Sequence, residues 1–282
     1  MVETSTNNNS IKCAKNVELD QESEKCLLSE EKKKYDELVT RIESDEELRE
    51  KKLDYQFLMK FLLCHQFDVD ATVTHIKGYF SVRRNFPGIY LKPSETIDVY
   101  QKKIMFKPNV RGSRGEGIMI IRVGNWNPKE MSAEHAMAGG IAYTELVQVD
   151  DSRRRAGVWE IIDAKGLSWS QIWSLKLSDY KLLAEGTELG QSFNFNGIIV
   201  INASSLVDFV YNKFLKWFFT KEFREKIRIF SGDWSEIFDF VPRNAVPVDM
   251  KGTLEGPDYN DWSLEELESQ DKAIIEYWER YK

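Results

Sequence analysis

The chain has 282 residues, of which 42% are hydrophobic and 30% charged, a composition typical of a folded globular protein. A formal net charge of -7 disfavours nucleic acid as a general partner, because the phosphate backbone attracts basic surfaces. No stretch approaches the ~18 consecutive apolar residues that a membrane-spanning helix needs. Three cysteines without metal-ligand spacing favour a reducing compartment. We therefore expect a soluble, cytoplasmic, monomeric protein.

Polar residues dominate the first segment, and helical periodicity begins after it. Residues 1–26 are rich in Asn, Ser and Glu, which predicts a disordered tail. Residues 27–93 carry apolar side chains at helical spacing and predict a small domain of three amphipathic helices. The residues expected to cap these helices, and the proline expected to end the last one, are Ser29, Asp54, Asp68 or Asp70, and Pro87.

Residues 94–256 alternate between strand and helix patterns, which predicts an α/β domain with a parallel or mixed sheet covered by helices. Short apolar runs predict strands at 117–123, 157–166, 197–202 and 226–230. Helical spacing predicts helices at 133–149 and 178–189. Residues 257–282 predict a final amphipathic helix that begins at Ser263.

The segment from Gly197 to Phe230 carries more aromatic surface than a helix packed on one side can hide. Treated as one long helix after a strand, it has a main apolar arc that contains Leu206, Val207, Val210, Tyr211, Phe214, Leu215, Trp217 and Phe218. Phe209 and Phe219 lie on the opposite side of this wheel. Either these two rings are core aromatics beneath a covering element, or the helix has two apolar surroundings.

The sequence carries no convincing pattern of an enzyme active site. The stretch RGSRGEG at 111–117 precedes a strand, whereas a phosphate loop lies between a strand and a helix, so a turn is expected. His65, His75 and His135 fall on separate predicted helices without metal-ligand spacing. Asp163, at the end of a strand, suits a turn as well as a catalytic acid. Since a GxSxG nucleophile motif is also missing, we expect no enzyme, catalytic residue, metal or cofactor.

Five blocks, in order along the chain, resemble one protein family. They are FLMKFLLCHQFDVDATVTHIKGYFSVRRNFPGIY, GVWEIIDAKGLSWSQI, GIIVINASSLVDFVYNKFLKWFF, KIRIFSGDWSEIFDFVP and VPVDMKGTL. Together they are similar to the blocks of the CRAL-TRIO lipid-binding family, from about Leu53 to Leu254. The resemblance implies an α/β fold in which an N-terminal helical subdomain is followed by a mixed sheet with helical cover. That sheet floors a hydrophobic cavity, and a mobile gate helix at Ser204–Lys226 closes it.

The resemblance also implies a set of site residues. The sheet and gate side chains expected to line the ligand cavity are Ile199, Ile201, Val207, Val210, Phe214, Leu215 and Phe218. Those expected to contact a membrane surface when the gate opens are Phe209, Phe219, Lys221, Arg224 and Lys226. A gate that covers an apolar ligand when closed and meets a bilayer when open needs apolar side chains on more than one side.

The family's function implies an intracellular carrier that binds a small hydrophobic lipid, such as a tocopherol or retinoid, and transfers it between membranes. Several members use basic residues to bind phosphoinositides at positions where this chain has Asn194, Asn196 and Glu222, although Lys226 matches. Recognition of phosphatidylinositol bisphosphate is therefore left open. The alternative function is a lipid-regulated adaptor whose acidic termini contact protein partners.

Overall fold

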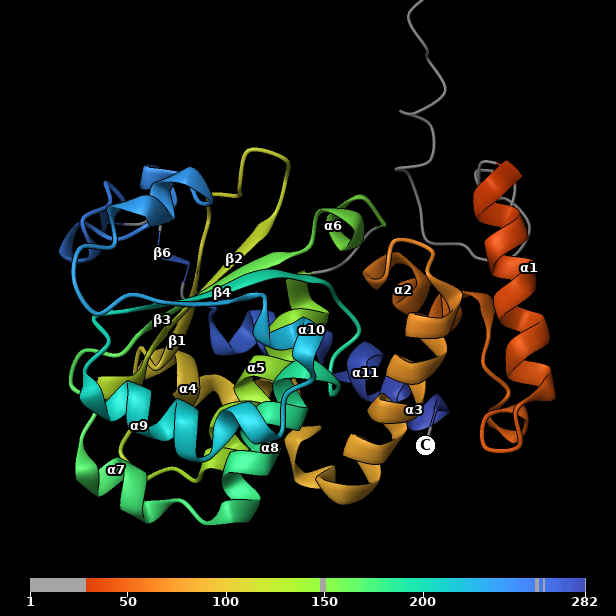
Figure 1. The fold of residues 1–282 in the computed structure, drawn as a ribbon, viewed down its shortest axis with the longest axis horizontal. Helices are drawn as coiled ribbons and strands as arrows, with labels where there is room; N and C mark the ends of the chain where they lie inside the picture. The colour runs from red at the N-terminus through yellow and green to blue at the C-terminus, as the bar shows by residue number, and fades with distance from the viewer. Residues whose placement is uncertain (1–28, 148–150, 257–258, 261, 282) are drawn as a thin grey trace, which may run out of the picture.

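The structure, a computed structural model, describes residues 29–147, 151–256, 259–260 and 262–281. The tail predicted at 1–26 lies outside the described residues. A helical unit lies beside a larger α/β unit whose sheet runs through its centre (Figure 1). The α/β class and the N-terminal helices expected from the sequence are confirmed. Within the described ranges, no helix is both long and apolar enough to cross a bilayer.

The helical unit contains the first three helices and the last one. Their bounds are Ser29–Ser44 (α1), Tyr55–Cys64 (α2), Val69–Asn85 (α3) and Leu264–Arg280 (α11). The carboxylates of Asp54 and Asp68 cap α2 and α3 by accepting hydrogen bonds from backbone N–H groups, each at 3.0 Å. Ser263 caps α11 in a capping box with Glu266. The sequence predicts all three of these caps, whereas Ser29, which it also names as a cap, is the first residue of α1.

Aromatic packing joins α11 to the N-terminal helices. The ring of Phe57 on α2 lies 4.6 Å from that of Tyr281, which follows α11, and 5.7 Å from that of Phe80 on α3. The guanidinium of Arg83 on α3 donates to the backbone carbonyl of Trp278 at 2.8 Å. The C-terminal helix therefore completes the core of the helical unit.

A six-stranded mixed sheet has the strand order β5-β4-β3-β2-β1-β6. The strands are Met105–Pro108 (β1), Gly117–Arg122 (β2), Val158–Asp163 (β3), Phe195–Ile201 (β4), Ile227–Ile229 (β5) and Tyr259–Asn260 (β6). Strands β2 to β5 run parallel, whereas β1 is antiparallel to both β2 and β6. The glycine-rich stretch forms the turn between β1 and β2, where Gly115 has a φ of 88°. That turn was predicted, but the short strands β1 and β6 were not.

Helices and 3-10 turns cover the two faces of the sheet unequally (Figure 1). The helices below the sheet include Ile97–Gln101 (α4), Ala133–Val147 (α5), Trp169–Ser174 (α7), Leu177–Glu188 (α8) and Ser205–Lys213 (α9). The turns on the other face are Ser235–Asp239 (η8), Arg243–Ala245 (η9) and Val248–Met250 (η10). Shorter helical elements elsewhere are Arg49–Lys51 (η3), Pro87–Ile89 (η4), Pro93–Thr96 (η5), Val123–Asn125 (η6) and Asp151–Ala156 (α6).

The segment at 204–226, which is expected to form the gate and is called the gate below, is not the single long helix that the sequence suggests. It divides into α9, a 3-10 turn at Leu215–Trp217 (η7) and a short helix at Lys221–Arg224 (α10). Phe214 breaks the helix, because its φ of -124° and ψ of -67° lie outside the helical region. In that conformation its ring stacks on Tyr180 of α8, with centroids 4.3 Å apart. The helical wheel drawn from the sequence therefore fails after Lys213.

Candidate ligand cavity

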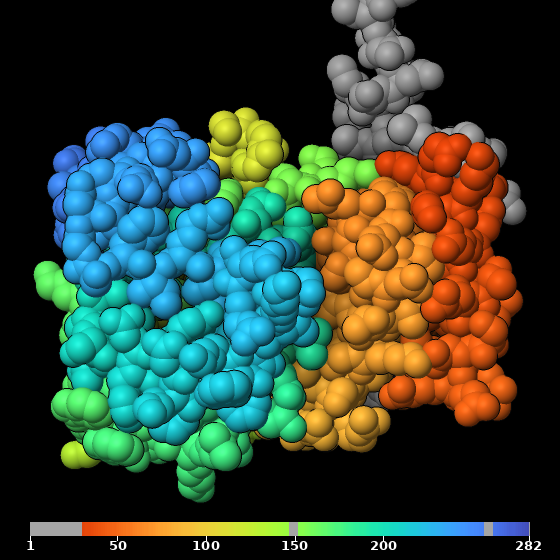
Figure 2. Space-filling model, in the orientation of Figure 1, coloured from red at the N-terminus to blue at the C-terminus, as the bar shows by residue number. Residues whose placement is uncertain are grey.

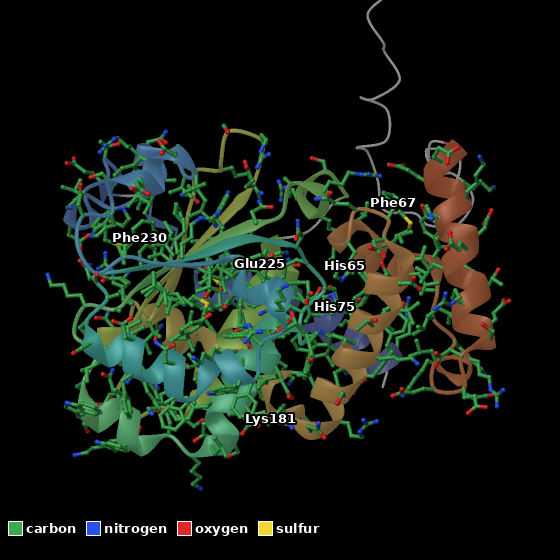
Figure 3. The ribbon with its side chains drawn as sticks, viewed as in Figure 1. His65, Phe67, His75, Lys181, Glu225 and Phe230 are labelled. Carbon is green, nitrogen blue, oxygen red and sulfur yellow. The ribbon has the colours of Figure 1, made fainter. Side chains whose placement is uncertain are left out.

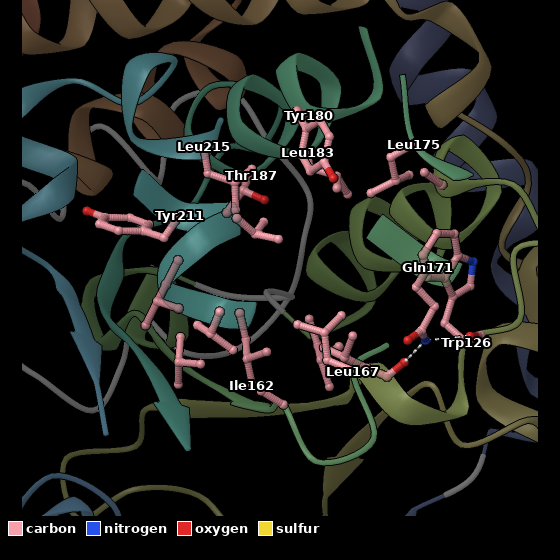
Figure 4. A pocket seen from close by; sticks show the side chains of 18 of the residues that line it. Trp126, Ile162, Leu167, Gln171, Leu175, Tyr180, Leu183, Thr187, Tyr211 and Leu215 are labelled. Carbon is pink, nitrogen blue, oxygen red and sulfur yellow. Dashed lines mark hydrogen bonds between the residues drawn. The ribbon is translucent and has the colours of Figure 1, made fainter. Parts of the chain in front are cut away.

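A cavity of about 300 Å³ lies between the sheet and the helices below it (Figure 4). Its floor is formed by alternate side chains of the parallel strands, namely Ile121, Glu160, Ile162, Ile198, Val200, Ile227 and Ile229. Successive side chains of a strand point to opposite faces, so these residues share one face. The volume falls at the small end of the range of about 300–1,000 Å³ for small-molecule sites.

The walls and roof come from helices that are far apart in sequence. The wall residues on α5, α7 and α8 include Ala136, Met137, Ile172, Tyr180, Leu183 and Thr187. The gate supplies the roof with Val207, Val210, Tyr211, Leu215 and Phe219. Almost every lining side chain is apolar, which suits a ligand that water would reject.

Two polar wall residues have their hydrogen bonds satisfied by the protein. The side-chain amide of Gln171 donates to the backbone carbonyls of Val123 and Trp126, each at 2.8 Å (Figure 4). Its oxygen accepts from the backbone N–H of Ser168 at 2.8 Å. The hydroxyl of Tyr180 donates to the carbonyl of Ile172 at 3.0 Å. These side chains hold the wall together and present little free polarity to the cavity.

Glu160 is the exception on the floor. Its side chain lies on β3, only 4% of the residue is exposed, and burial raises the pKa of its carboxyl to about 8. A buried carboxyl resists ionisation because charge is costly in an apolar surrounding. The sequence analysis did not single out this residue. The signal was present, since VWEIID places one glutamate inside an otherwise apolar stretch of a covered strand.

The two floor residues predicted from the sequence lie on the face of the sheet that does not line the cavity. Ile199 and Ile201 are fully buried on the opposite face of the sheet, against Trp234 and Ile237. Their neighbours Ile198 and Val200 face the cavity instead. An uninterrupted apolar run such as GIIVI gives no alternation from which to assign the two faces, so the sequence alone could not distinguish them.

The predicted gate residues divide into two groups. Val207, Val210 and Leu215 line the cavity. Phe214 and Phe218 do not lie among the residues that line it, because the helix breaks at Phe214 and the chain turns. Phe214 instead fastens the gate to α8 through its stack on Tyr180.

The two rings predicted to contact a membrane lie on different sides of the gate. Phe219 lines the cavity and packs on Phe223 of α10, with centroids 5.1 Å apart. Phe209 is half-buried against two tryptophans of α7, Trp169 and Trp173, at centroid distances of 5.4 and 6.3 Å. These two tryptophans are 48% and 68% exposed and stack on each other. We call Trp169, Trp173 and Phe209 the aromatic face.

The two tryptophans of the aromatic face were not predicted from the sequence. Their spacing of four residues on a short helix, with no obvious core to fill, was the available signal. A further indole, Trp217 on η7, is 70% exposed. Large apolar side chains exposed together on neighbouring elements usually mark an interaction surface.

The predicted basic residues do not form one cluster on the aromatic face. Lys221 is exposed, and Arg224 donates to the backbone carbonyl of Lys216 within the gate at 3.4 Å. Lys226 is half-buried, donates to the side-chain oxygen of Asn194 at 3.1 Å, and has a pKa lowered by burial. Burial and, to a smaller extent, the charge of Lys226 lower the pKa of His65 on the helical unit.

Two histidines that the sequence places on separate helices meet in space. Nε2 of His65, at the end of α2, lies 2.8 Å from Nδ1 of His75, inside α3 (Figure 3). Burial lowers the pKa of His65 to about 4 and that of His75 to about 3. Both rings are therefore neutral at neutral pH, and one can donate to the other. Among the described residues, no group of three or more His, Cys, Asp or Glu could hold a metal ion.

One polar contact fastens the end of the gate. The carboxylate of Glu188, the last residue of α8, accepts hydrogen bonds from the backbone N–H of Thr220 at 3.0 Å and from the Thr220 hydroxyl. Burial raises the pKa of Glu188 above its usual range. In the described part of the chain, the side-chain hydrogen bonds of residues 205–219 stay within the gate. Apolar contacts therefore hold most of the gate on the cavity.

A mixed sheet that floors an apolar cavity is typical of α/β domains that bind small molecules. The model of the CRAL/TRIO domain matches residues 101–252, more than half of the 282-residue chain. The chain therefore belongs to the CRAL-TRIO family, whose members generally bind and transfer lipids.

Two relatives and one solved structure are similar to this chain. The chain is 24% identical to "Alpha-tocopherol transfer protein-like" from Homo sapiens over 228 residues, which is 80% of this chain and 66% of that protein. The Mus musculus protein of the same name is 22% identical over the same shares. The chain thus spans just under two thirds of the length of these relatives. The crystal structure of Sfh5 has the same fold, with a TM-score of 0.52 and 16% identity, over 92% of this chain and 100% of that one.

Proposed function

We propose that this protein is a carrier that holds one small hydrophobic lipid in the cavity and transfers it between membranes. The cavity carries this proposal, because it is almost wholly apolar and is roofed by the gate. Each buried CH₂ of a ligand contributes about 0.8 kcal/mol, so even a short lipid chain can drive binding. The similarity to alpha-tocopherol transfer protein-like relatives supports a lipid ligand.

The gate has the contacts of an element that can open. It lies on the cavity through ring stacking of Phe214 on Tyr180 and is fastened at one end by Thr220 and Glu188. Opening would break these contacts without breaking a sheet or a buried ion pair. The lost apolar contacts can be replaced by lipid, because a bilayer is as apolar as the cavity wall.

The aromatic face is the surface that we propose meets the bilayer. Tryptophan suits the boundary between lipid and water, since its ring is apolar and its N–H is polar. The face joins α7 to the gate through Phe209, so its insertion would act directly on the gate. Phe209 keeps its predicted membrane role in this proposal, whereas Phe219 is assigned to the cavity. Lys221 and Arg224 can add attraction to anionic lipids at about 1 kcal/mol per charge.

We propose no enzymatic activity. Asp163, the acid considered from the sequence, already accepts hydrogen bonds from the backbone N–H of Lys165 at 2.9 Å and the side chain of Asn202 at 2.8 Å. These bonds shape the turn after β3. Its substitution should therefore affect folding rather than turnover of esters or phosphoesters.

A vesicle assay tests the carrier function. Purified protein should increase the transfer of a fluorescent hydrophobic lipid from donor to acceptor vesicles in proportion to its concentration. The variant Ile162→Trp fills the cavity from its floor and should abolish transfer while keeping the circular dichroism of the wild type. Equal transfer by both proteins would reject the carrier. A wild-type protein that neither binds nor transfers lipid would favour the adaptor.

A further inference from the structure

The position of Glu160 is unusual for a charged residue type. It lies in the middle of β3, between Met119 of β2 and Ile198 of β4 in the sheet register. Both neighbours are buried apolar residues, and the floor continues with Ile162 on the same strand. The carboxyl is therefore aimed into an apolar cavity rather than toward solvent or a turn.

Glu160 also differs from other little-exposed glutamates in its partners. Glu116 is paired with Arg114 at 2.9 Å, and Glu145 with Lys60 at 2.8 Å. Throughout the part of the chain that the structure describes, no hydrogen bond or ion pair joins the Glu160 carboxyl to another protein group. Buried polar groups are nearly always hydrogen-bonded, so a partner from outside the protein is the natural explanation.

A carboxyl in this surrounding keeps its proton at neutral pH. Burial raises its pKa to about 8, and desolvation is the cause. The neutral acid has one O–H donor and an oxygen that can accept. It is thus equipped to donate a hydrogen bond to an uncharged oxygen.

We propose that Glu160 is the polar anchor of the cavity, and that the ligand is an uncharged lipid whose alcohol, aldehyde or ketone oxygen accepts a hydrogen bond from this carboxyl. The inference rests on the proposed carrier function and adds the chemical class of the ligand. The apolar part of the ligand then covers Ile162, Val200 and Ile229, farther along the strands.

Charged ligands fit this site less well. A carboxylate would meet the negative end of the Glu160 dipole and would itself be desolvated without a counter-ion. An ammonium brings three N–H donors, but the backbone carbonyls of β3 around Glu160 are engaged by pairing with β2 and β4. An ion pair inside an apolar cavity also loses the hydration of both charges.

Four radiolabelled probes with alkyl chains of equal length test the role of Glu160 in the whole protein. They are hexadecanol, hexadecane, hexadecylammonium and palmitate, and each is partitioned between vesicles and the protein. Wild-type protein should bind hexadecanol about ten-fold more tightly than hexadecane, the value of one net hydrogen bond. Glu160→Met should remove this preference. Glu160→Gln, which keeps a donor, should retain most of it. Ile161→Val, a change on the opposite, packed face of β3, should leave the preference unchanged.

A spectroscopic readout separates an anchor from a residue that only shapes the cavity. The infrared C=O band of protonated Glu160 should shift when hexadecanol binds and should be missing from Glu160→Gln. An unshifted band would count against the anchor.

Several outcomes would overturn the proposal: equal binding of hexadecanol and hexadecane, a preference that survives Glu160→Met, or tighter binding of hexadecylammonium or palmitate. Failure of all four probes to bind, in a protein that still transfers lipid, would also reject it. If instead the wild-type protein transfers no lipid at all, the carrier function itself fails.

Discussion

The two faces of the central sheet are made by the same strands but are covered in different ways. Toward η8 and η10, side chains such as Trp159, Ile161 and Ile199 form a continuous buried cluster with Trp234 and Ile237. Toward α8 and the gate, equally apolar side chains surround about 300 Å³ of space. Figure 2 shows that the gate and α8 form the outer surface at the lower front of the α/β unit.

Because of this difference, one face of the sheet contributes mainly to stability, and the other leaves space for a ligand. A packed face gains dispersion contacts and hydrophobic burial, whereas a face left hollow forgoes part of both. The hollow face therefore contributes less to folding and keeps its apolar area for a ligand. Substitutions on adjacent residues of one strand should reveal this division.

The largest effect is the difference in the free energy of unfolding that we expect between Ile161→Ala and Ile162→Ala. These two neighbouring residues of β3 lie on opposite faces of the sheet. Ile161 is fully buried, and truncating it should lower the free energy of unfolding by about 2–5 kcal/mol. Ile162 already borders empty space, so its truncation should cost roughly 1 kcal/mol. Urea denaturation of the ligand-free proteins measures both. Equal losses would mean that the cavity is filled in solution.

The second effect concerns pH and Glu160. Because its pKa is raised in the folded protein to about 8, the unfolded chain releases this proton near pH 4.5 while the folded chain keeps it. Its contribution to stability therefore falls as the pH rises from about 4.5 to about 8. Glu160→Gln should remove this fall and be more stable than wild type at pH 8, by on the order of 2 kcal/mol.

Thermal and urea denaturation at several pH values check the Glu160 prediction. Glu222→Gln, on the exposed surface of the gate, is the matched control and should follow the wild-type profile. A Glu160→Gln protein whose stability falls with pH as steeply as the wild type would show that the carboxyl ionises freely.

A third, smaller effect is expected where the gate is fastened. Phe214→Ala removes the stack on Tyr180 and should cost about 1 kcal/mol of stability. It should speed ligand release several-fold, because the gate loses its main contact with α8. Stopped-flow transfer to acceptor vesicles measures the rate. Trp217→Ala, on an exposed ring of the same gate, should leave the release rate unchanged in the absence of membranes.

The smallest effect on stability is expected on the aromatic face. Trp173→Asp changes an exposed side chain and should alter the free energy of unfolding by no more than about 0.5 kcal/mol. It should nevertheless slow transfer between vesicles, since it places a charge where the face meets the bilayer. Phe219→Asp, inside the cavity, should instead melt early or lose ligand. Normal transfer by Trp173→Asp would show that the aromatic face does not contact the membrane.

Sequence patterns predicted the parts of the fold that depend on local signals. The caps Asp54, Asp68 and Ser263 act through side chains that bond to nearby backbone groups, so their effect is visible in a short window. The order of strands and helices likewise followed from alternating apolar runs. The resemblance to the CRAL-TRIO family, which the family model confirms, supplied the cavity and the gate.

The expectations that differ from the structure concern features that depend on contacts between residues distant in sequence. The break at Phe214 coincides with its stack on Tyr180 of α8, a residue that is distant in sequence and that no helical wheel of the gate contains. The face assignment of Ile199 and Ile201 depends on how β4 pairs with β3 and β5. The role proposed for Glu160 depends on the cavity that it lines, whose walls come from helices distant in sequence.

Organic extraction of the purified protein followed by mass spectrometry tests the carrier proposal most directly. The wild-type chain should release one uncharged hydrophobic compound in a ratio close to one per protein, and Ile162→Trp should release none while remaining folded. An empty wild-type protein, or an equal amount of the same compound from both proteins, would contradict the assignment of the cavity as the lipid site.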